Sequence, residues 1–458
     1  MDRVDESKSL VAGLDPSTSS HEPSVVEHLP IELIRLIIDS IDDQDDKDEK
    51  RDSDADECAS ECSEEDYSTN SPFIRGIRTE GKYHPSRSLL ICSLVCRAWN
   101  EISRVRIFHK LTVAYWNINA RLHFLHFTAP HLASYVVEFH LMWVGDGREP
   151  AEWVPVCLGS LKNLSIVHIL ERPSSAIHRP PSLAPVCRSL LAAPLLQELL
   201  LAGLVFRRGS VDLIDFLSIP SATLEKLTLL SILSPEEERT TAERTVVRMD
   251  RLRTIRFLET THDVLRQHHI ECPHLRSVFV QLRSDKPWLP PPWIPHGLSE
   301  IIIRLPTDRP VPEFGNYIRP SDMTIDVFED YSYSRSLDWV QCCINHLPFP
   351  EQLIRLTINI TVDLRYAPVT YSPDPVDYQK LCDALQILYK HGSLQYVNLG
   401  LTIGGNGRAE DAFIQANEVQ KLKETFAALF DASVLAAKLV FIRLRGFRES
   451  VLFTTTLY

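Results

Sequence analysis

The sequence predicts an α/β repeat protein, in which a helical N-terminal module precedes an irregular solenoid with a parallel sheet. Two observations predict this class. A six-residue apolar pattern recurs along the chain from residue 136 to its C-terminal part, and two amphipathic segments precede it, at residues 29–41 and 86–111. With 458 residues, 44% of them hydrophobic, the chain can bury a large core.

Two polar stretches interrupt this organisation. Residues 1–27 are poor in apolar side chains, and we expect them to be disordered. Residues 42–85 form an acidic insertion, in which residues 42–66 hold fourteen carboxylates against three basic side chains. That stretch carries −11 of the chain's net charge of −13, which leaves −2 for the rest. The charge therefore suggests no nucleic-acid partner.

Both amphipathic segments have helical spacing. Apolar residues in the first recur at steps of three and four, and Pro30 stands at its start, where a missing N–H group costs nothing. The second segment has a similar stripe, with Trp99 on its flank: Leu90, Leu94, Val95, Ala98 and Ile102. Neither helix is long enough to be stable alone, so we expect the two to pack on each other or on a partner.

These residues resemble the F-box. The match begins with Leu29, Pro30, Glu32, Leu33, Ile37 and Ile38, and continues with Leu94, Val95, Cys96, Arg97, Trp99, Arg104 and Phe108. Members of the family usually join the two halves by a few residues, whereas residues 42–85 intervene here. The resemblance implies a helical module over residues 28–111 that binds a Skp-family adaptor, and through it a cullin scaffold. It assigns the adaptor contact to Leu29, Pro30, Leu33, Ile37, Ile38, Leu94, Val95 and Trp99.

The repeat over residues 112–458 has the form apolar-x-x-apolar-x-apolar, whose last two apolar side chains point the same way along a strand. Copies start at Val136, Leu161, Leu196, Leu224, Leu252, Leu275, Leu298, Leu353, Leu394 and Leu439, with a degenerate copy at Asp322. Helices are expected between strands at residues 183–191, 211–217, 263–269, 335–346, 376–391 and 409–430. A longer helix is expected at residues 119–134, before the array.

This array resembles a leucine-rich-repeat domain that lacks the usual Asn column. An F-box followed by such repeats is similar to an arrangement common among fungal members of the family. The resemblance implies a substrate receptor of an SCF-type E3 ubiquitin ligase, which holds a protein substrate and performs no chemistry itself. The alternative is a protein-binding repeat scaffold outside any ligase.

A binding surface is expected along the strands, on the side chains between the two core-facing apolar positions. That column reads His140, Ser165, Leu200, Thr228, Arg256, Phe279, Ile302, Asp326, Thr357, Asn398 and Arg443. Arg256, Phe279 and Arg443 are candidate contacts to a protein substrate. In the proline-rich segment 286–296, Trp288 and Trp293 are either further anchors for a partner or a cover for the core.

No catalytic residue, metal ligand or cofactor site is expected. The segment Gly404-Gly405-Asn406-Gly407 lacks the Lys-Ser/Thr of a phosphate loop, and the ten cysteines lack zinc-ligand spacing. A third alternative, a hydrolase, has no supporting motif. The N-terminus has no apolar signal region and no apolar run could span a bilayer, so we expect an intracellular protein without a membrane partner, cytoplasmic or nuclear.

Overall fold

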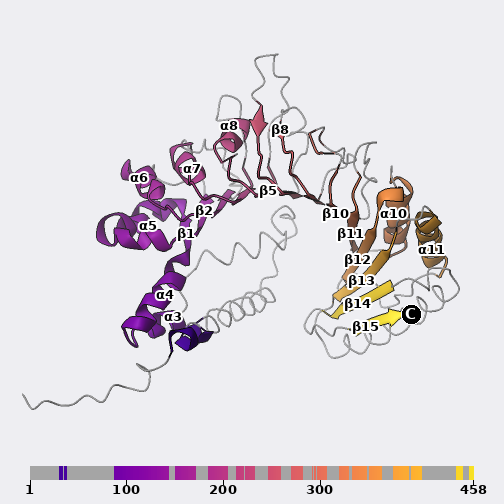
Figure 1. Ribbon diagram of the computed structural model, residues 1–458, viewed down its shortest axis with the longest axis horizontal. Coiled ribbons are helices and arrows are strands. Elements are labelled where there is room, and N and C mark those ends of the chain that lie inside the picture. The colour runs from indigo at the N-terminus through magenta and orange to yellow at the C-terminus, as the bar shows by residue number, and fades with distance from the viewer. Residues whose placement is uncertain are drawn as a thin grey trace, which may run out of the picture. The chain divides into compact units, whose positions relative to one another are not determined.

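The structure is a computed structural model (Figure 1). It describes residues 30–34, 36–38, 87–143, 150–171, 184–204, 213–220, 222–232, 246–258, 270–281, 291, 293–295, 297–306, 319–329, 333–347, 350–363, 375–390, 394–404, 440–446 and 453–457. The chain divides into two compact units, Met1–Ile107 and Phe108–Tyr458. The expected disordered regions at residues 1–27 and 42–85 lie outside the described residues.

The first unit is a small helical cluster. Residues 31–34 and 36–38 are helical, followed after the insertion by α3 (Arg87–Cys92) and α4 (Arg97–His109). Its core consists of Ile34, Ile38, Leu89, Cys92 and Trp99, so side chains from both amphipathic segments pack on each other. This joins two stretches that the acidic insertion separates in sequence.

The second amphipathic segment is not one helix, as its spacing suggested. A turn over residues 93–95 separates α3 from α4. The amide of Leu94 donates to the carbonyl of Ile91, and the Asn100 side chain donates to the carbonyl of Ser93 over 2.7 Å. These bonds satisfy backbone carbonyl groups at the end of α3, where the regular helical hydrogen bonds end. They stabilise the turn, although the apolar spacing continues through it.

The second unit is built on a large sheet. Its thirteen strands are ordered β1-β2-β3-β4-β5-β7-β9-β10-β11-β12-β13-β14-β15, and each described pair is parallel except β14 with β15. The strands are β1 (Lys110–Ala114), β2 (Glu138–Trp143), β3 (Ile166–Glu171), β4 (Glu198–Ala202), β5 (Lys226–Leu230), β7 (Thr254–Leu258), β9 (Ser277–Gln281), β10 (Glu300–Pro306), β11 (Asp322–Glu329), β12 (Arg355–Asp363), β13 (Tyr396–Gly404), β14 (Val440–Gly446) and β15 (Phe453–Leu457). Two short strands, β6 (Val247–Arg248) and β8 (Ile270–Glu271), pair separately.

Helical segments connect these strands. They are the turn η5 (Tyr115–Asn117), α5 (Ile118–His123), a π-helical segment η6 (Phe124–Thr128), a 3₁₀ segment η7 (Pro130–Tyr135), α6 (Trp153–Gly159), α7 (Ala184–Leu191), α8 (Leu213–Ser218), α10 (Tyr333–Asn345), η8 (Pro350–Gln352) and α11 (Pro375–Lys390). The expected helix at residues 119–134 is thus three different helical forms in succession. The pattern missed α6, and the helices expected at 263–269 and 409–430 lie outside the described part of the chain.

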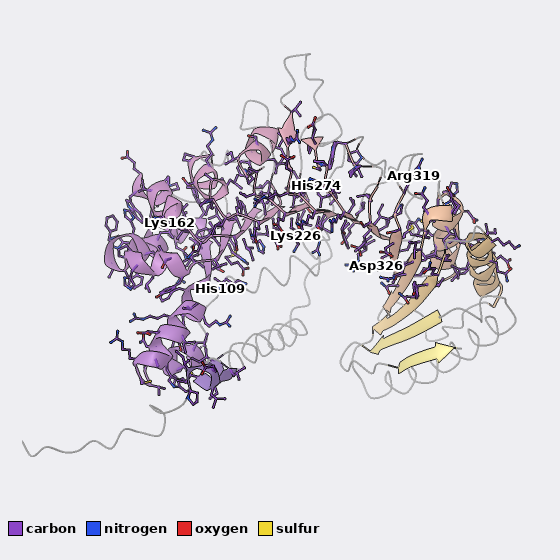
Figure 2. The ribbon with its side chains drawn as sticks, in the orientation of Figure 1. His109, Lys162, Lys226, His274, Arg319 and Asp326 are labelled. Atoms are coloured by element: carbon purple, nitrogen blue, oxygen red, sulfur yellow. The ribbon has the colours of Figure 1, made fainter. Side chains whose placement is uncertain are left out.

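The sheet has two unlike faces. On the core face, one continuous apolar cluster joins alternate strand residues, such as Val167, Leu229 and Val278, to buried residues of the helices, such as Leu190 and Cys343. The opposite face, which we name the second face, carries the remaining strand side chains, and Lys226 and Asp326 project from it (Figure 2). This division follows from the period of two in a β-strand.

The register of the strands defines the central row of the second face. Successive neighbours in this row are Thr112, His140, His168, Leu200, Thr228, Arg256, Phe279, Ile302, Thr324, Thr357, Asn398 and Phe441. Eight of these positions agree with the column expected from the sequence and three differ, while Thr112 lies on β1, before the first expected copy.

The differences are corrections of register. His168, not Ser165, lies beside His140, because the copy begins at Leu164 rather than Leu161. Thr324 replaces Asp326, and Phe441 rather than Arg443 pairs with Asn398, because Arg443 pairs with Gly400. The segment LKNLSIVHI fits the pattern from either leucine. Leu161 is buried in the turn before the strand, so the match that starts at Leu164 is the one that forms β3.

Among the described residues, no helix is both long and apolar enough to cross a membrane.

The corrected register makes opposite predictions for two isoleucines of β3. Ile169 is fully buried on the core face, whereas Ile166 lies on the second face between Glu138 and Glu198. Ile169→Ala should lower the free energy of unfolding by about 2–5 kcal/mol, and Ile166→Ala by less than about 1 kcal/mol. Urea denaturation followed by circular dichroism measures both, and equal losses would contradict this register.

Candidate functional site

The first candidate site is an apolar surface on the helical unit. Leu33, Ile37 and Val95 are exposed, and Leu94, in the turn between α3 and α4, is 83% exposed. Other large apolar side chains of these segments are also exposed: Ile31, Leu36, Leu90, Ile91 and Val105. Single exposed apolar residues are ordinary, but this many on so short a unit mark a surface that a partner can cover.

The residues expected to contact the adaptor thus fall into two groups. Leu33, Ile37, Leu94 and Val95 are presented to solvent, and Pro30 is exposed as well. Ile38 and Trp99 are instead buried in the unit's own core, so we reassign them from partner contact to holding the helices together. Leu29 lies outside the described residues.

The second candidate site is the second face of the sheet, where two predicted residues meet. Arg256 and Phe279 are register neighbours on β7 and β9, and the guanidinium carbon of Arg256 is 6.0 Å from the ring centroid of Phe279. The guanidinium carbon of Arg304 is 5.6 Å from the same ring centroid. The ring is therefore flanked by two cations, in the distance range of cation–π attraction. An aromatic group between two guanidinium groups suits a ligand that is both apolar and acidic.

The other predicted contacts are not brought to this place. Trp293 packs against the core cluster and its ring centroid is 6.4 Å from that of Phe257, a core-face residue. It therefore covers the core, the second of the two interpretations its sequence allowed. Trp288 and the side chain of Arg443 lie outside what the structure describes.

Opposite charges face each other across neighbouring strands of the second face. Lys226 Nζ lies 2.6 Å from Glu198 Oε1, and Arg304 Nη2 lies 3.1 Å from Asp326 Oδ2. Further cross-strand pairs are Lys110 with Glu138, Arg355 with Asp322, Ser277 with Glu300, Asn359 with Asp326, and Asn398 with Thr357. Each pair contributes a few tenths of a kcal/mol to about 1 kcal/mol, and together they hold polar side chains in set positions.

The register also gathers a cluster that the sequence pattern did not indicate. Glu138 and His140 are two residues apart on β2, and His168 of β3 is the direct neighbour of His140. One ligand atom from each of the three lies within 4.8 Å of the others, and the two imidazole centroids are 4.2 Å apart. The sequence pattern placed Ser165 in this column, so it did not indicate His168. The signal was present as a His at the same repeat position of two successive copies.

Electrostatics within this cluster favour a charged carboxylate. Burial raises the pKa of Glu138, but a hydrogen bond with His140 and the charges of His140, Lys110 and His168 outweigh it and lower the pKa to about 2. Glu138 bonds Nε2 of His140, and the Lys110 ammonium lies 3.9 Å from the same carboxylate oxygen. The cluster therefore holds an ionised carboxylate beside two imidazoles, a set of groups that can bind a proton or a metal ion.

No protein-family model matches this chain, and a search of curated proteins finds no match.

Glu138 should make stability depend on acid pH. Its carboxylate contributes stability above the ordinary pKa of 4.5 and loses that contribution as the pH falls toward the folded-state pKa of about 2. In Glu138→Gln this dependence is absent. Between pH 5 and pH 3 the wild type should therefore lose about 1 kcal/mol more than the variant, allowing for the partial exposure of the carboxylate.

Urea titrations at both pH values, with a chelator present, measure this difference. Glu198→Gln is the matched control, because Glu198 holds the same row position two strands away and pairs with Lys226. Parallel pH curves for wild type and Glu138→Gln would contradict the assignment.

Proposed function

We propose that this chain is an F-box protein, the substrate-recognition subunit of an SCF-type E3 ubiquitin ligase. The helical unit docks a Skp-family adaptor, and the sheet unit is an irregular leucine-rich-repeat solenoid that holds a protein substrate. The protein itself is not an enzyme. The ordered match of Leu29-Pro30-x-Glu32-Leu33 and Leu94-Val95-Cys96-Arg97-x-Trp99 to the F-box carries this proposal.

The exposure pattern of the helical unit supports it. Of the apolar side chains in the match, Ile38 and Trp99 are buried within the unit, whereas Leu33 and Leu94 are exposed. The unit thus has more apolar surface than its own core hides, as expected of a module that is completed by a partner's helices. Burying one leucine against a partner is worth about 1.5–3 kcal/mol.

The repeat interpretation is supported by the core positions. Leu196, Leu199 and Leu201 occupy the three leucine positions of one copy, and all are fully buried. The ninth position, which is Asn or Cys in regular leucine-rich repeats, is Leu204 here and Ile232 in the next copy, both buried. An apolar side chain there suits a degenerate array, in which packing replaces the hydrogen bonds that an Asn side chain makes.

Adaptor binding tests the first half of the proposal. The full chain should retain a recombinant Skp-family adaptor, and Leu94→Asp and Leu33→Asp should each weaken binding roughly 30-fold or more, because a carboxylate is placed in an apolar contact. Leu195→Asp, at a leucine 50% exposed in the other unit, is the matched control and should bind normally. Isothermal titration calorimetry measures the affinity. Equal binding by all three variants would contradict the proposal.

Ligase function requires a second measurement. When adaptor, cullin and a conjugating enzyme charged with ubiquitin through a thioester are present, lysines of proteins bound to the sheet unit should acquire ubiquitin, and Leu94→Asp should abolish the transfer. Adaptor binding without such transfer would favour a repeat scaffold that works outside a ligase.

A further inference from the structure

We propose that Glu138, His140 and His168 form a binding site for a divalent transition-metal ion of the zinc class, on the second face of the sheet at β2 and β3. The two imidazoles and the carboxylate come from one strand and its direct neighbour, and one ligand atom of each lies within 4.8 Å of the others. This site is independent of the proposed ligase role.

The geometry of the strands makes the cluster possible. Residues two apart on a strand point to the same face, so Glu138 and His140 are presented side by side. Parallel pairing then sets His168 directly beside His140, with ring centroids 4.2 Å apart. Ligand atoms around a tetrahedral zinc ion lie about 3.3 Å from one another, so small rotations of these side chains suffice to coordinate the ion.

The chemistry of the donors selects the type of ion. Two imidazole nitrogens and one carboxylate suit Zn²⁺ and its first-row neighbours, whereas Ca²⁺ and Mg²⁺ prefer sites made wholly of oxygen. Three protein ligands are the set found in zinc sites that keep one position for water. A carboxylate is ionised at neutral pH, so this ligand needs no deprotonation on binding.

Binding replaces contacts that exist in the cluster. The ion would take the Glu138 carboxylate and Nε2 of His140 in place of their mutual hydrogen bond. It would also compete with the Lys110 ammonium, 3.9 Å from the same carboxylate oxygen, for the charge of Glu138. Lys110 has a long flexible side chain that can turn away, so it weakens the site without blocking it.

Titration with Co²⁺ tests the site in the full chain. Protein stripped with EDTA and kept reduced should bind one Co²⁺ with d–d absorption in the visible, and without the near-ultraviolet charge-transfer band of cobalt–thiolate bonds. His168→Gln and Glu138→Gln should each weaken binding about 100-fold or more. His274→Gln, at an exposed histidine before β9, is the matched control and should bind as the wild type does.

Lys110→Met provides a test that cannot be explained by misfolding. It keeps all three ligands and removes the competing positive charge, so it should bind Co²⁺ several-fold more tightly. An unchanged or weaker affinity would count against the site. Absence of Co²⁺ binding by the wild type, or a thiolate band that persists in His168→Gln, would overturn the proposal, because the latter places the ion on cysteines.

Discussion

The structure depends on the register of one parallel sheet. Parallel pairing aligns equivalent residues of neighbouring strands in rows, and the period of two assigns every row to one face. The core face is apolar from Val113 on β1 to Val397 on β13. A shift of one residue in any strand would turn its buried side chains toward the other face, so burial of the core specifies the register strongly. This register also determines which side chains lie on the second face.

The second face is only partly accessible: Arg304 is exposed and Arg256 half-buried, whereas Leu200, Thr228 and Leu230 of the same face are buried. Cross-strand pairs such as Glu198 with Lys226 hold its charges in position, and Phe279 lies between Arg256 and Arg304. Groups held in position in this way would bind a ligand at a lower entropic cost than mobile side chains. The helical unit offers a different kind of surface, apolar and centred on exposed leucines such as Leu94.

The parts of the fold that the sequence predicted share a physical reason. In the copies starting at Leu196, Leu224 and Leu252, the fourth and sixth positions face the core as the pattern predicts, so strand and face are as expected there. The copy near Leu161 failed because two overlapping matches differ by three residues, and local spacing cannot choose between them. The turn after α3 was missed because the hydrogen bonds of Asn100 and Ser93 that support it leave no periodic trace. Similarly, the placement of Trp293 on the core depends on Phe257, a contact that no short-range pattern contains.

The register between β2 and β3 differs from the one expected from the sequence, and measuring it is the most direct test of this account. Cysteines at neighbouring positions of adjacent strands are close enough for an oxidative cross-link, whereas cysteines several residues out of register are not. The double variant His140→Cys/His168→Cys should form a cross-link that peptide mapping by mass spectrometry detects, because these residues are register partners. The double variant His140→Cys/Ser165→Cys should not, since Ser165 precedes the strand. Cross-linking of the second pair but not the first would contradict the register, and with it the composition of the second face.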